Sequence, residues 1–428
     1  MTQEAWQFVS VDQLQVGQFI RLGHRWFEHP FLLNRFRIAS EKEIAIIRDA
    51  RLTRLFVDLA RSDAGAMASA TPAVAQTDPV DAPAQAASTD HLQSRKNALA
   101  ERVRGQHDML SQTREQYAAA VLGCRQAFDQ LAAGRSTATG EVGALTQSIL
   151  TLAASNTRPL TYAAAARPDD AATLRACRAL DAAAIAAAVG RRLGLASQAL
   201  TTLATAALLH AVGLEELPSM MQDEAAMRDP DLLTDFQQYP VLGADLLERC
   251  GGFSPDVMRI VRQHRERLDG TGFPDATPGQ RIHPHAPVIG AIREFQVLAE
   301  HGESTMPATA LAQLFRRLRS AYGPVAIDNV IATLTIYPPG SFLALTDGSI
   351  GRVMQVSERS RLRPTVCLFD DTVAPAEAQI VDLAETDALS VERVLDPQQL
   401  DTEVREFFGS GWSGIAFAGD TRAAQQAA

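Results

Sequence analysis

Two histidines stand out because of the residues that surround them. His210 follows an apolar run in "LLHAVGL", and His264 heads the stretch "HRERLDGTGFP", which runs from charged residues into two glycines, an aromatic residue and a proline. Imidazoles serve as metal ligands, as general bases or as hydrogen-bonded core groups. Each of these histidines, taken alone, is more often a core or surface residue than a ligand. Two imidazoles without a carboxylate also make a poor divalent-metal site.

The remaining histidines and the cysteines give weaker signals. His283 and His285, two residues apart around a proline, have no Asp, Glu or Cys near them in the sequence, which makes them weak metal ligands. His24 and His29 lie in an aromatic stretch, where packing or surface roles are expected. Four cysteines are far apart and form no CxxC pair, which indicates core thiols in a reducing compartment; they are Cys124, Cys177, Cys250 and Cys367.

Length and charge exclude several classes of protein. The chain has 428 residues, a formal net charge of -10 and a pI near 5.4. It is long enough for two to four units, and a broad basic surface for nucleic acid is not expected. We find no secretory signal, no apolar run long enough to span a membrane, and no GxGxxG, P-loop or nucleophile elbow. The sequence therefore predicts a cytoplasmic protein with no membrane span.

The two histidines lie in a segment, residues 141–335, whose pattern is helix after helix. One helix ends in Gly194, the next ends near Gly213 just after His210, and a third begins at Ser254 and leads to His264. The Ala-rich run from Ala179 to Ala188 is typical of a closely packed helix. We expect this all-helical domain to position the candidate site.

Smaller parts flank that domain, so the fold class predicted is mainly α, with a small N-terminal α/β module and a small C-terminal β subdomain. The N-terminal module, residues 1–62, should contain strands in "GQFIRL" and "TRLFVDL" and a helix capped by Ser40 with Glu43 in a capping box. The aromatic stretch "HRWFEHPFLLNRF" is expected to form its core. Residues 63–90 are predicted to be a disordered Ala/Pro linker.

A helical connector is predicted over residues 91–140. Apolar residues recur there every seven positions, which allows a dimeric coiled coil but favours packing against the neighbouring domain; they are Val103, Leu110, Tyr117, Cys124 and Leu131. Residues 336–408 carry short alternating runs around an Asp347-Gly348 hairpin signal and predict the β subdomain. Residues 409–428 are predicted to be a flexible tail.

The motif order "LLH..G", "YP..GADLL" and "H.ERLDGTGFP", followed by "YPPGSFLALTDGSIGRV", resembles the HD-GYP family across residues 141–370. The N-terminal segment also resembles the small module of unknown function that often precedes HD-GYP domains. The resemblance implies a relative of bacterial phosphodiesterases that hydrolyse cyclic di-GMP at a two- or three-metal centre. An active member would use iron or manganese.

Residue-by-residue comparison with the family motifs changes this expectation. His210 and His264 match family ligands. Five other positions that align with family metal ligands carry residues that do not bind metals; they are Arg178, Ala211, Tyr239, Arg265 and Arg293. The position of Arg178 in this alignment is assigned to within one helical turn. A guanidinium repels a divalent cation and offers forked donors to phosphate or carboxylate. Leu214 also replaces a phosphate-facing lysine. The prediction is therefore no catalytic residue and no metal, with a scaffold favoured over a cyclic di-GMP sensor.

The loop after His264 follows the family pattern, except that Phe273 replaces the tyrosine of GYP. The residues of this loop either shape a structural turn or dock a partner, and we favour docking; they are Glu266, Arg267, Asp269, Gly270, Gly272, Phe273 and Pro274. By the resemblance, the partner would be a GGDEF-type diguanylate cyclase or another signalling protein. Cyclic di-GMP binding and homodimerisation stay open.

The prediction is a catalytically degenerate HD-GYP protein that acts as a regulatory or protein-interaction module in bacterial cyclic di-GMP signalling. The alternative is an active, metal-dependent cyclic di-GMP phosphodiesterase that uses His210, His264 and acidic residues not yet located. A third hypothesis is a regulator of unrelated partners.

Overall fold

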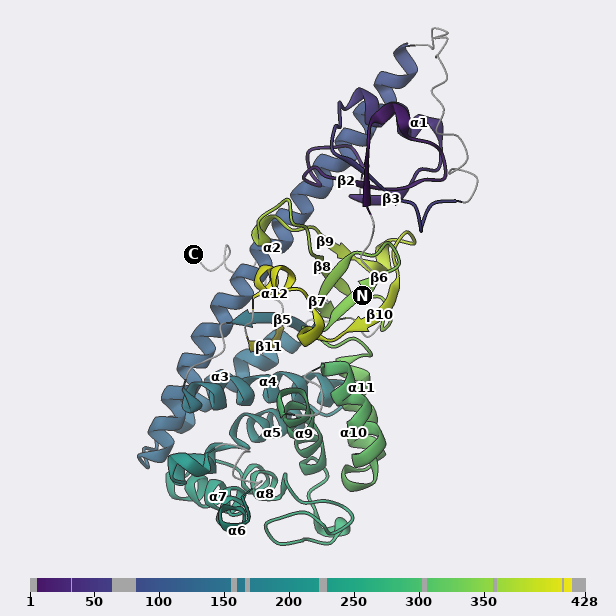
Figure 1. Ribbon diagram of the computed structural model, residues 1–428. Coiled ribbons are helices and arrows are strands. Elements are labelled where there is room, and N and C mark those ends of the chain that lie inside the picture. The colour runs from purple at the N-terminus through teal and green to yellow at the C-terminus, as the bar shows by residue number, and fades with distance from the viewer. Residues whose placement is uncertain are drawn as a thin grey trace. The chain divides into compact units, whose positions relative to one another are not determined.

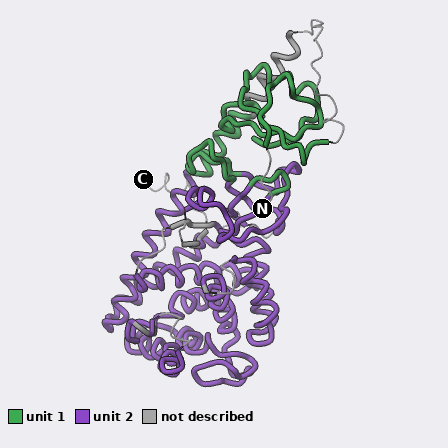
Figure 2. The backbone as a smooth tube through the Cα atoms, in the orientation of Figure 1, with its two compact units in different colours: residues 1–107, 345–349, 368–380 green, residues 108–344, 350–367, 381–428 purple. Residues whose placement is uncertain are grey.

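The computed structural model describes nine stretches of the chain, residues 6–31, 33–63, 82–154, 160–165, 170–222, 229–301, 306–356, 360–409 and 412–417. The chain divides into two compact units (Figure 2). Unit 1 comprises residues 1–107, 345–349 and 368–380, and unit 2 comprises the remainder. The predicted fold class is confirmed: a helical domain is combined with a small N-terminal sheet module and a C-terminal sheet subdomain (Figure 1).

The N-terminal module is a four-stranded sheet with one helix. The antiparallel strands have the order β1-β4-β2-β3, where β1 is Trp6–Val9, β2 Phe19–Leu22, β3 Arg35–Arg37 and β4 Leu55–Asp58. Helix α1, Glu41–Asp49, packs against one face through Ile44 and Ile47. Both expected strands and the helix are confirmed.

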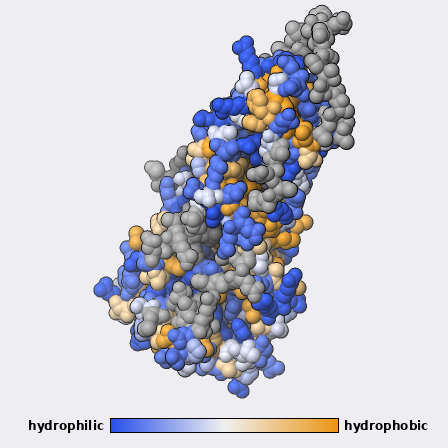
Figure 3. Space-filling view, viewed as in Figure 1, coloured by the Kyte–Doolittle hydropathy of each residue, from blue (hydrophilic) through white to orange (hydrophobic). Residues whose placement is uncertain are grey.

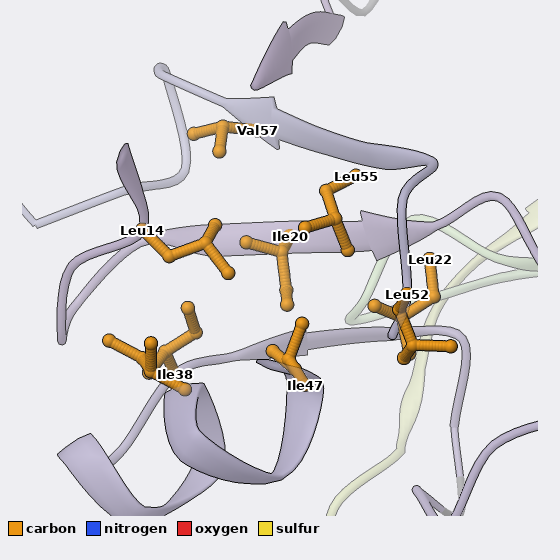
Figure 4. Packing of buried hydrophobic residues seen from close by; sticks show 9 residues of the cluster. Leu14, Ile20, Leu22, Ile38, Ile47, Leu52, Leu55 and Val57 are labelled. Atoms are coloured by element: carbon orange, nitrogen blue, oxygen red, sulfur yellow. The ribbon is translucent and has the colours of Figure 1, made fainter. Parts of the chain in front are cut away.

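The core of this module is aliphatic. Ile20 and Leu22 of β2 and Leu55 and Val57 of β4 pack with Ile47 and neighbouring residues (Figure 4). The prediction of an aromatic core is wrong, because alternation along β2 and β4 turns branched aliphatic side chains inward. Phe31 and Phe36 are only partly buried beside this core, and Trp26 belongs to a separate cluster.

The capping box expected at α1 is not formed. The Glu43 carboxylate accepts a hydrogen bond from the backbone N–H of Ala39 at 2.6 Å, one residue before the expected donor. The side chain of Ser40 makes no capping hydrogen bond. At α8, Pro255–Gln263, the predicted cap is present, because Ser254 accepts a hydrogen bond from the N–H of Val257.

Helix α2, Ala82–Ala132, is one long helix that contributes to both units. The five heptad residues from Val103 to Leu131 are all buried, and Tyr117 donates a hydrogen bond to Asp181 within unit 2. Packing within the chain therefore accounts for the heptad pattern. Residues 82–90 of the predicted linker are helical, and residues 64–81 lie outside the described part of the chain.

The helical domain is built around α4, which is buried at almost every position from Leu174 to Gly190. Small alanine side chains allow neighbouring helices to approach it closely. The helices after α2 are α3 Ala138–Ala154, α4 Ala171–Arg192, α5 Ser197–Leu209, α6 Pro230–Phe236, α7 Tyr239–Cys250, α8, α9 Ala286–His301, α10 Pro307–Tyr322 and α11 Pro324–Leu334.

One described segment, Ser197–Glu216, is long and apolar enough to cross a bilayer by length and composition. It includes α5, and 67% of its apolar window is buried inside the fold. A core helix of a globular domain has these properties, so the segment is weak evidence for a membrane span. Figure 3 shows hydrophilic side chains over much of the viewed face of unit 2.

The second sheet has the strand order β10-β6-β7-β5-β11, with β8 paired to β7 and β9 paired to β8. Its members are β5 Leu160–Ala165, β6 Phe342–Leu345, β7 Ile350–Val356, β8 Thr365–Leu368, β9 Ile380–Asp382, β10 Val391–Leu395 and β11 Trp412–Phe417, and α12, Thr402–Phe408, precedes β11. The predicted hairpin turn is present, with Gly348 at φ +79°.

Two strands of this sheet differ from the prediction. β5 interrupts the segment expected to be helical throughout, and β11 lies in the predicted flexible tail, residues 409–428. The two strands pair with each other, Leu160 opposite Phe417. Their hydrogen-bond partners lie far away in sequence, so local pattern could not reveal them. Residues 418–428 lie outside the described part of the chain.

Candidate functional site

The fold brings His210 and His264 together. His210 is the C-cap residue of α5, and His264 is the C-cap residue of α8. Both residues are fully buried, and their rings meet edge to face with centroids 5.3 Å apart. The two histidines that match family ligands therefore form one buried pair.

Backbone carbonyls fix the orientation of both rings. The Nδ1 atom of His210 lies 2.7 Å from the carbonyl oxygen of Ala207, and Nδ1 of His264 lies 2.7 Å from that of Val261. Because a carbonyl oxygen only accepts hydrogen bonds, each Nδ1 carries a proton, and in a neutral ring Nε2 then keeps its lone pair. This is the tautomer that metal-binding histidines use.

The lone pair of His264 is already engaged. The hydroxyl of Tyr239, the first residue of α7, lies 2.8 Å from Nε2 of His264 and donates a hydrogen bond to it. Tyr239 is buried and packs against Phe236. The ring nitrogen that would bind a metal thus accepts a hydrogen bond from a phenol hydroxyl.

Burial and neighbouring cations keep His264 neutral. Desolvation lowers the pKa of His264 well below its usual value, and His210, Arg265 and Arg293 lower it further. The carbonyl of Val261 opposes these effects. His264 is therefore a neutral hydrogen-bond acceptor at Nε2 near pH 7.

Each of two buried arginines that the sequence comparison aligns with family ligand positions faces a glutamate. Arg178 of α4 donates from Nε to both carboxylate oxygens of Glu300 on α9, at 3.1 and 3.0 Å, and its Nη2 also bonds this carboxylate. Arg265 has Nη2 3.6 Å from Oε1 of Glu294, and its guanidinium lies over the Phe273 ring. These contacts neutralise the buried guanidinium groups internally.

The same carboxylate of Glu294 also accepts a hydrogen bond from the hydroxyl of Tyr322 at 3.1 Å and contacts Arg267 at 3.4 Å. Arg293, the residue before it, is buried on α9. Sequence reasoning missed Glu294 and Glu300. No local signal marks them, because their partners Arg265 and Arg178 lie on other segments.

The one-turn uncertainty at Arg178 does not bring a histidine into the site. Arg175, one turn earlier on α4, pairs with Glu215 at 2.8 Å. Asp181, almost one turn later, accepts hydrogen bonds from the hydroxyl of Tyr117 and the N–H of Ile415. These side chains hold helices and strands together.

An apolar cluster occupies the places where the family pattern expects a bridging carboxylate and a lysine. Ala211 and Leu214 pack with Phe236 and Tyr239, and Phe273 lies against them. Carbon surfaces there offer no ligand to a cation or a phosphate. Apolar packing therefore holds this corner of the domain together.

These donors do not fit a two- or three-metal centre. Such a centre needs several carboxylates and imidazoles around cations a few ångströms apart. Among the described residues, no three His, Cys, Asp or Glu side chains are grouped so that they could hold a metal ion. One imidazole nitrogen is bonded to Tyr239, and the nearby arginines repel cations.

The loop after His264 is fixed from its inner side by Glu266. The buried Glu266 carboxylate accepts hydrogen bonds from the N–H of Asp275 at 2.8 Å, the N–H of Thr277 at 3.0 Å and the Thr277 hydroxyl at 3.2 Å. Gly272 passes so close that a Cβ there would lie 2.3 Å from the backbone nitrogen of Arg267. The backbone of the loop at Gly272 therefore leaves no room for a larger side chain.

The residues of this loop divide between its two sides. Phe273 faces inward, with its ring 6.3 Å from that of Tyr239. Leu268, Asp269 and Gly270 are exposed, and Asp269 accepts hydrogen bonds from the N–H and hydroxyl of Thr271, which lower the pKa of its carboxyl. Glu266 and Phe273 hold the loop, while 268–271 form its outer surface.

The remaining histidines have structural contacts. His283 lies 3.8 Å from Asp256, an acid that is distant in the sequence and comes from the first turn of α8. Nδ1 of His283 accepts the N–H of His285, which leaves the proton on Nε2 and disfavours metal binding there. His24 accepts two backbone N–H groups and His29 bonds Asn34.

The thiols agree with the sequence prediction. All four cysteines are free and buried. Burial raises the pKa of Cys177 and Cys367 to about 12, so neither is a reactive thiolate near neutral pH.

Comparison with known families and proteins agrees with this architecture. Three family models match the chain: a domain of unknown function, DUF3391, over residues 7–142, an HD domain over 149–328, and a KOW domain associated with HD domains over 342–403. The chain is 24% identical to the cyclic di-GMP phosphodiesterase PA4108 of Pseudomonas aeruginosa, over 95% of this chain and 96% of that protein. The chain therefore contains an HD domain between a DUF3391 domain and a KOW domain, and it is similar to cyclic di-GMP phosphodiesterases of the HD-GYP family.

Two further HD-GYP relatives match shorter segments. The cyclic di-GMP phosphodiesterase PdeB of Borreliella burgdorferi is 21% identical over 42% of this chain and 48% of its own length. A solved HDG"Y"P protein of Bdellovibrio bacteriovorus, Bd1817, is 13% identical with a TM-score of 0.41, covering 76% of this chain and 98% of that one.

Proposed function

We propose that this HD-GYP protein is catalytically degenerate and acts in the bacterial cytoplasm as a regulatory or protein-interaction module in cyclic di-GMP signalling. The hydrogen bond from Tyr239 to Nε2 of His264 carries the proposal. In the family this histidine binds a metal ion, whereas here its Nε2 accepts a hydrogen bond from a neutral hydroxyl group. The apolar cluster around Ala211 and Leu214 supports it.

The arginine contacts favour a scaffold over a nucleotide sensor. Arg178 is bonded to Glu300, and Arg265 lies next to Glu294. A phosphate would have to displace these buried carboxylates before it could bind the guanidinium groups, and separating a buried pair is costly. The module therefore acts through protein contacts rather than through bound cyclic di-GMP.

The outer surface of the loop, residues 268–271, is the proposed protein contact. Glu266 and Gly272 hold its shape, and Leu268 exposes 38% of its surface at the tip. The partner would be a GGDEF-type diguanylate cyclase or another signalling protein.

A second candidate function is metal-dependent hydrolysis of cyclic di-GMP. The relative PA4108, which is named as such a phosphodiesterase, aligns over 95% of this chain. An active enzyme would need iron or manganese and ligands beyond the histidine pair.

Hydrolysis and binding assays separate these functions. Purified full-length protein is incubated with cyclic di-GMP and excess Mn²⁺ or Fe²⁺, and binding is measured by calorimetry. We expect no product and no binding heat. Product formation that is lost in His210→Ala but kept in His283→Ala would establish the phosphodiesterase. Binding without hydrolysis would establish the sensor instead.

A further inference from the structure

Within unit 1, the N-terminal module contacts two segments from the C-terminal part of the chain, residues 345–349 and 368–380 (Figure 2). We call these contacts the joint. They include polar side chains, a hollow and an apolar cluster, and none of these belongs to the site around His264.

One half of the joint is polar. Arg21 of β2 forms an ion pair with Asp371, and Asn34 donates a hydrogen bond from Nδ2 to Asp370 at 2.8 Å. Arg35 of β3 donates to the carbonyl oxygen of Gly348 at 3.0 Å. The exposed fractions of the Arg21 and Asp371 side chains are 25% and 37%. Such an accessible ion pair is weak and screened by salt.

A buried histidine orients the amide in this polar half. Nε2 of His29 lies 2.7 Å from Oδ1 of Asn34, which can only accept, so the imidazole is the donor. Burial, followed by the positive charge of Lys96, lowers the pKa of His29 to about 4. The neutral imidazole thus holds the Asn34 amide with its nitrogen towards Asp370.

The polar half also encloses a hollow of about 60 Å³. Its lining includes Arg21, Asn34, Arg35, Ser349 and Asp370. A hollow of this volume with polar walls has room for several water molecules. Water can replace the polar contacts here when the surfaces separate, which lowers the cost of opening.

The other half of the joint is apolar and buried. Trp26, Val103 of α2 and Val373 form a buried apolar cluster. Nε1 of Trp26 donates a hydrogen bond to the carbonyl oxygen of Glu377 at 2.8 Å, and a ring nitrogen of His107 lies 2.7 Å from the carbonyl oxygen of Ala378. Separating these groups exposes apolar surface to water, so this half is the more strongly held.

From this asymmetry we propose that the joint is a hinged contact: residues 345–349 and 368–372 detach from the N-terminal module while residues 373–378 stay anchored at Trp26. Through this hinge, a change in the N-terminal module would alter the positions of residues 345–349 and 368–372, which form turns of the C-terminal sheet. It does not depend on the function proposed for the helical domain.

Hydrogen exchange with mass spectrometry on the full chain tests the hinge. In Arg21→Asp we expect the amides of 368–372 to exchange about fivefold faster, a change typical of losing an accessible ion pair. Residues 373–380 should exchange at the wild-type rate. The charge-swapped double variant Arg21→Asp/Asp371→Arg should restore slow exchange. Raising the salt concentration should accelerate exchange at 368–372 alone.

A matched pair provides the control. Arg319 and Asp328 form an exposed ion pair in unit 2, and the swap Arg319→Asp/Asp328→Arg should leave exchange in both halves unchanged. Equal acceleration of 368–372 and 373–380 in Arg21→Asp would overturn the hinge, and so would no acceleration in either. Trp26→Ala should accelerate both segments; acceleration of 373–380 alone would contradict the assigned order.

Discussion

The histidine pair and the loop that follows it differ in what they retain of the HD-GYP pattern. Around His210 and His264, the positions where the sequence comparison expects ligands carry a tyrosine, an alanine and arginines that face glutamates. In residues 266–277, the residues that hold the backbone are present and bonded. The loop is thus held by hydrogen bonds within its own segment, whereas the histidine pair depends on contacts from neighbouring helices.

The largest expected effect concerns the buried arginine pairs. Glu300→Gln leaves the Arg178 guanidinium buried without its counter-charge, so we expect a loss of about 3–5 kcal/mol in the free energy of unfolding. Urea denaturation measures it. Asp328→Asn, in a pair whose side chains are 44% and 46% exposed, should lose less than about 1 kcal/mol. Equal losses would show that the Arg178 pair is not a core contact.

Next in size is the effect of adding a methyl group to the loop. In Gly272→Ala the new Cβ would meet the backbone of Glu266 and Arg267, so the loop must shift, at a cost of about 2–3 kcal/mol. Gly270, at φ +77° with open space around it, should cost about 1 kcal/mol when changed to Ala. Thermal unfolding of both variants checks the order, and the reverse order would contradict the close fit at Gly272.

A smaller loss is expected when the loop loses its internal acceptor. Glu266→Gln keeps the shape but removes the charge that accepts three hydrogen bonds, which should cost about 2 kcal/mol. Hydrogen exchange at residues 275–277 should accelerate, while exchange in α5 should not change. Faster exchange in both residues 275–277 and α5 would mean that the loop and the histidine pair unfold as one cooperative element. It would contradict the view that the loop is held by its own contacts.

The smallest effect is expected at the tyrosine. Tyr239→Phe removes the donor to Nε2 of His264 and should cost about 1 kcal/mol, because one neutral hydrogen bond is lost while the ring packing remains. Urea denaturation gives the loss, and Tyr322→Phe, whose hydroxyl bonds Glu294, serves as the comparison. No loss in Tyr239→Phe would argue that the hydrogen bond is not formed.

Local signals in the sequence predicted much of the fold. Ser254 as a cap, the helix leading to His264 and the strands containing Ile20 and Val57 follow from periodicity and capping residues, which act over a few positions. β5 and β11 could not be predicted, since their partners come from distant segments. The prediction that the aromatic stretch forms the core of the N-terminal module was wrong, because Trp26 packs with Val103 and Val373 instead.

At the candidate site, the family pattern pointed to the positions but not to their contacts. It located His210 and His264, whose meeting depends on how α5 and α8 pack. It could not show that Glu300 neutralises Arg178, because these residues lie on different helices. Asp256 beside His283 was missed for the same reason.

Metal content distinguishes a degenerate site from a working metal centre. Full-length protein is purified from cells grown with added iron and manganese, and its metal content is measured beside that of His210→Ala by mass spectrometry. We predict no stoichiometric iron or manganese in either protein, because Tyr239 engages His264 and arginines surround the pair. One or more bound metal ions per wild-type chain, lost in His210→Ala, would contradict the account.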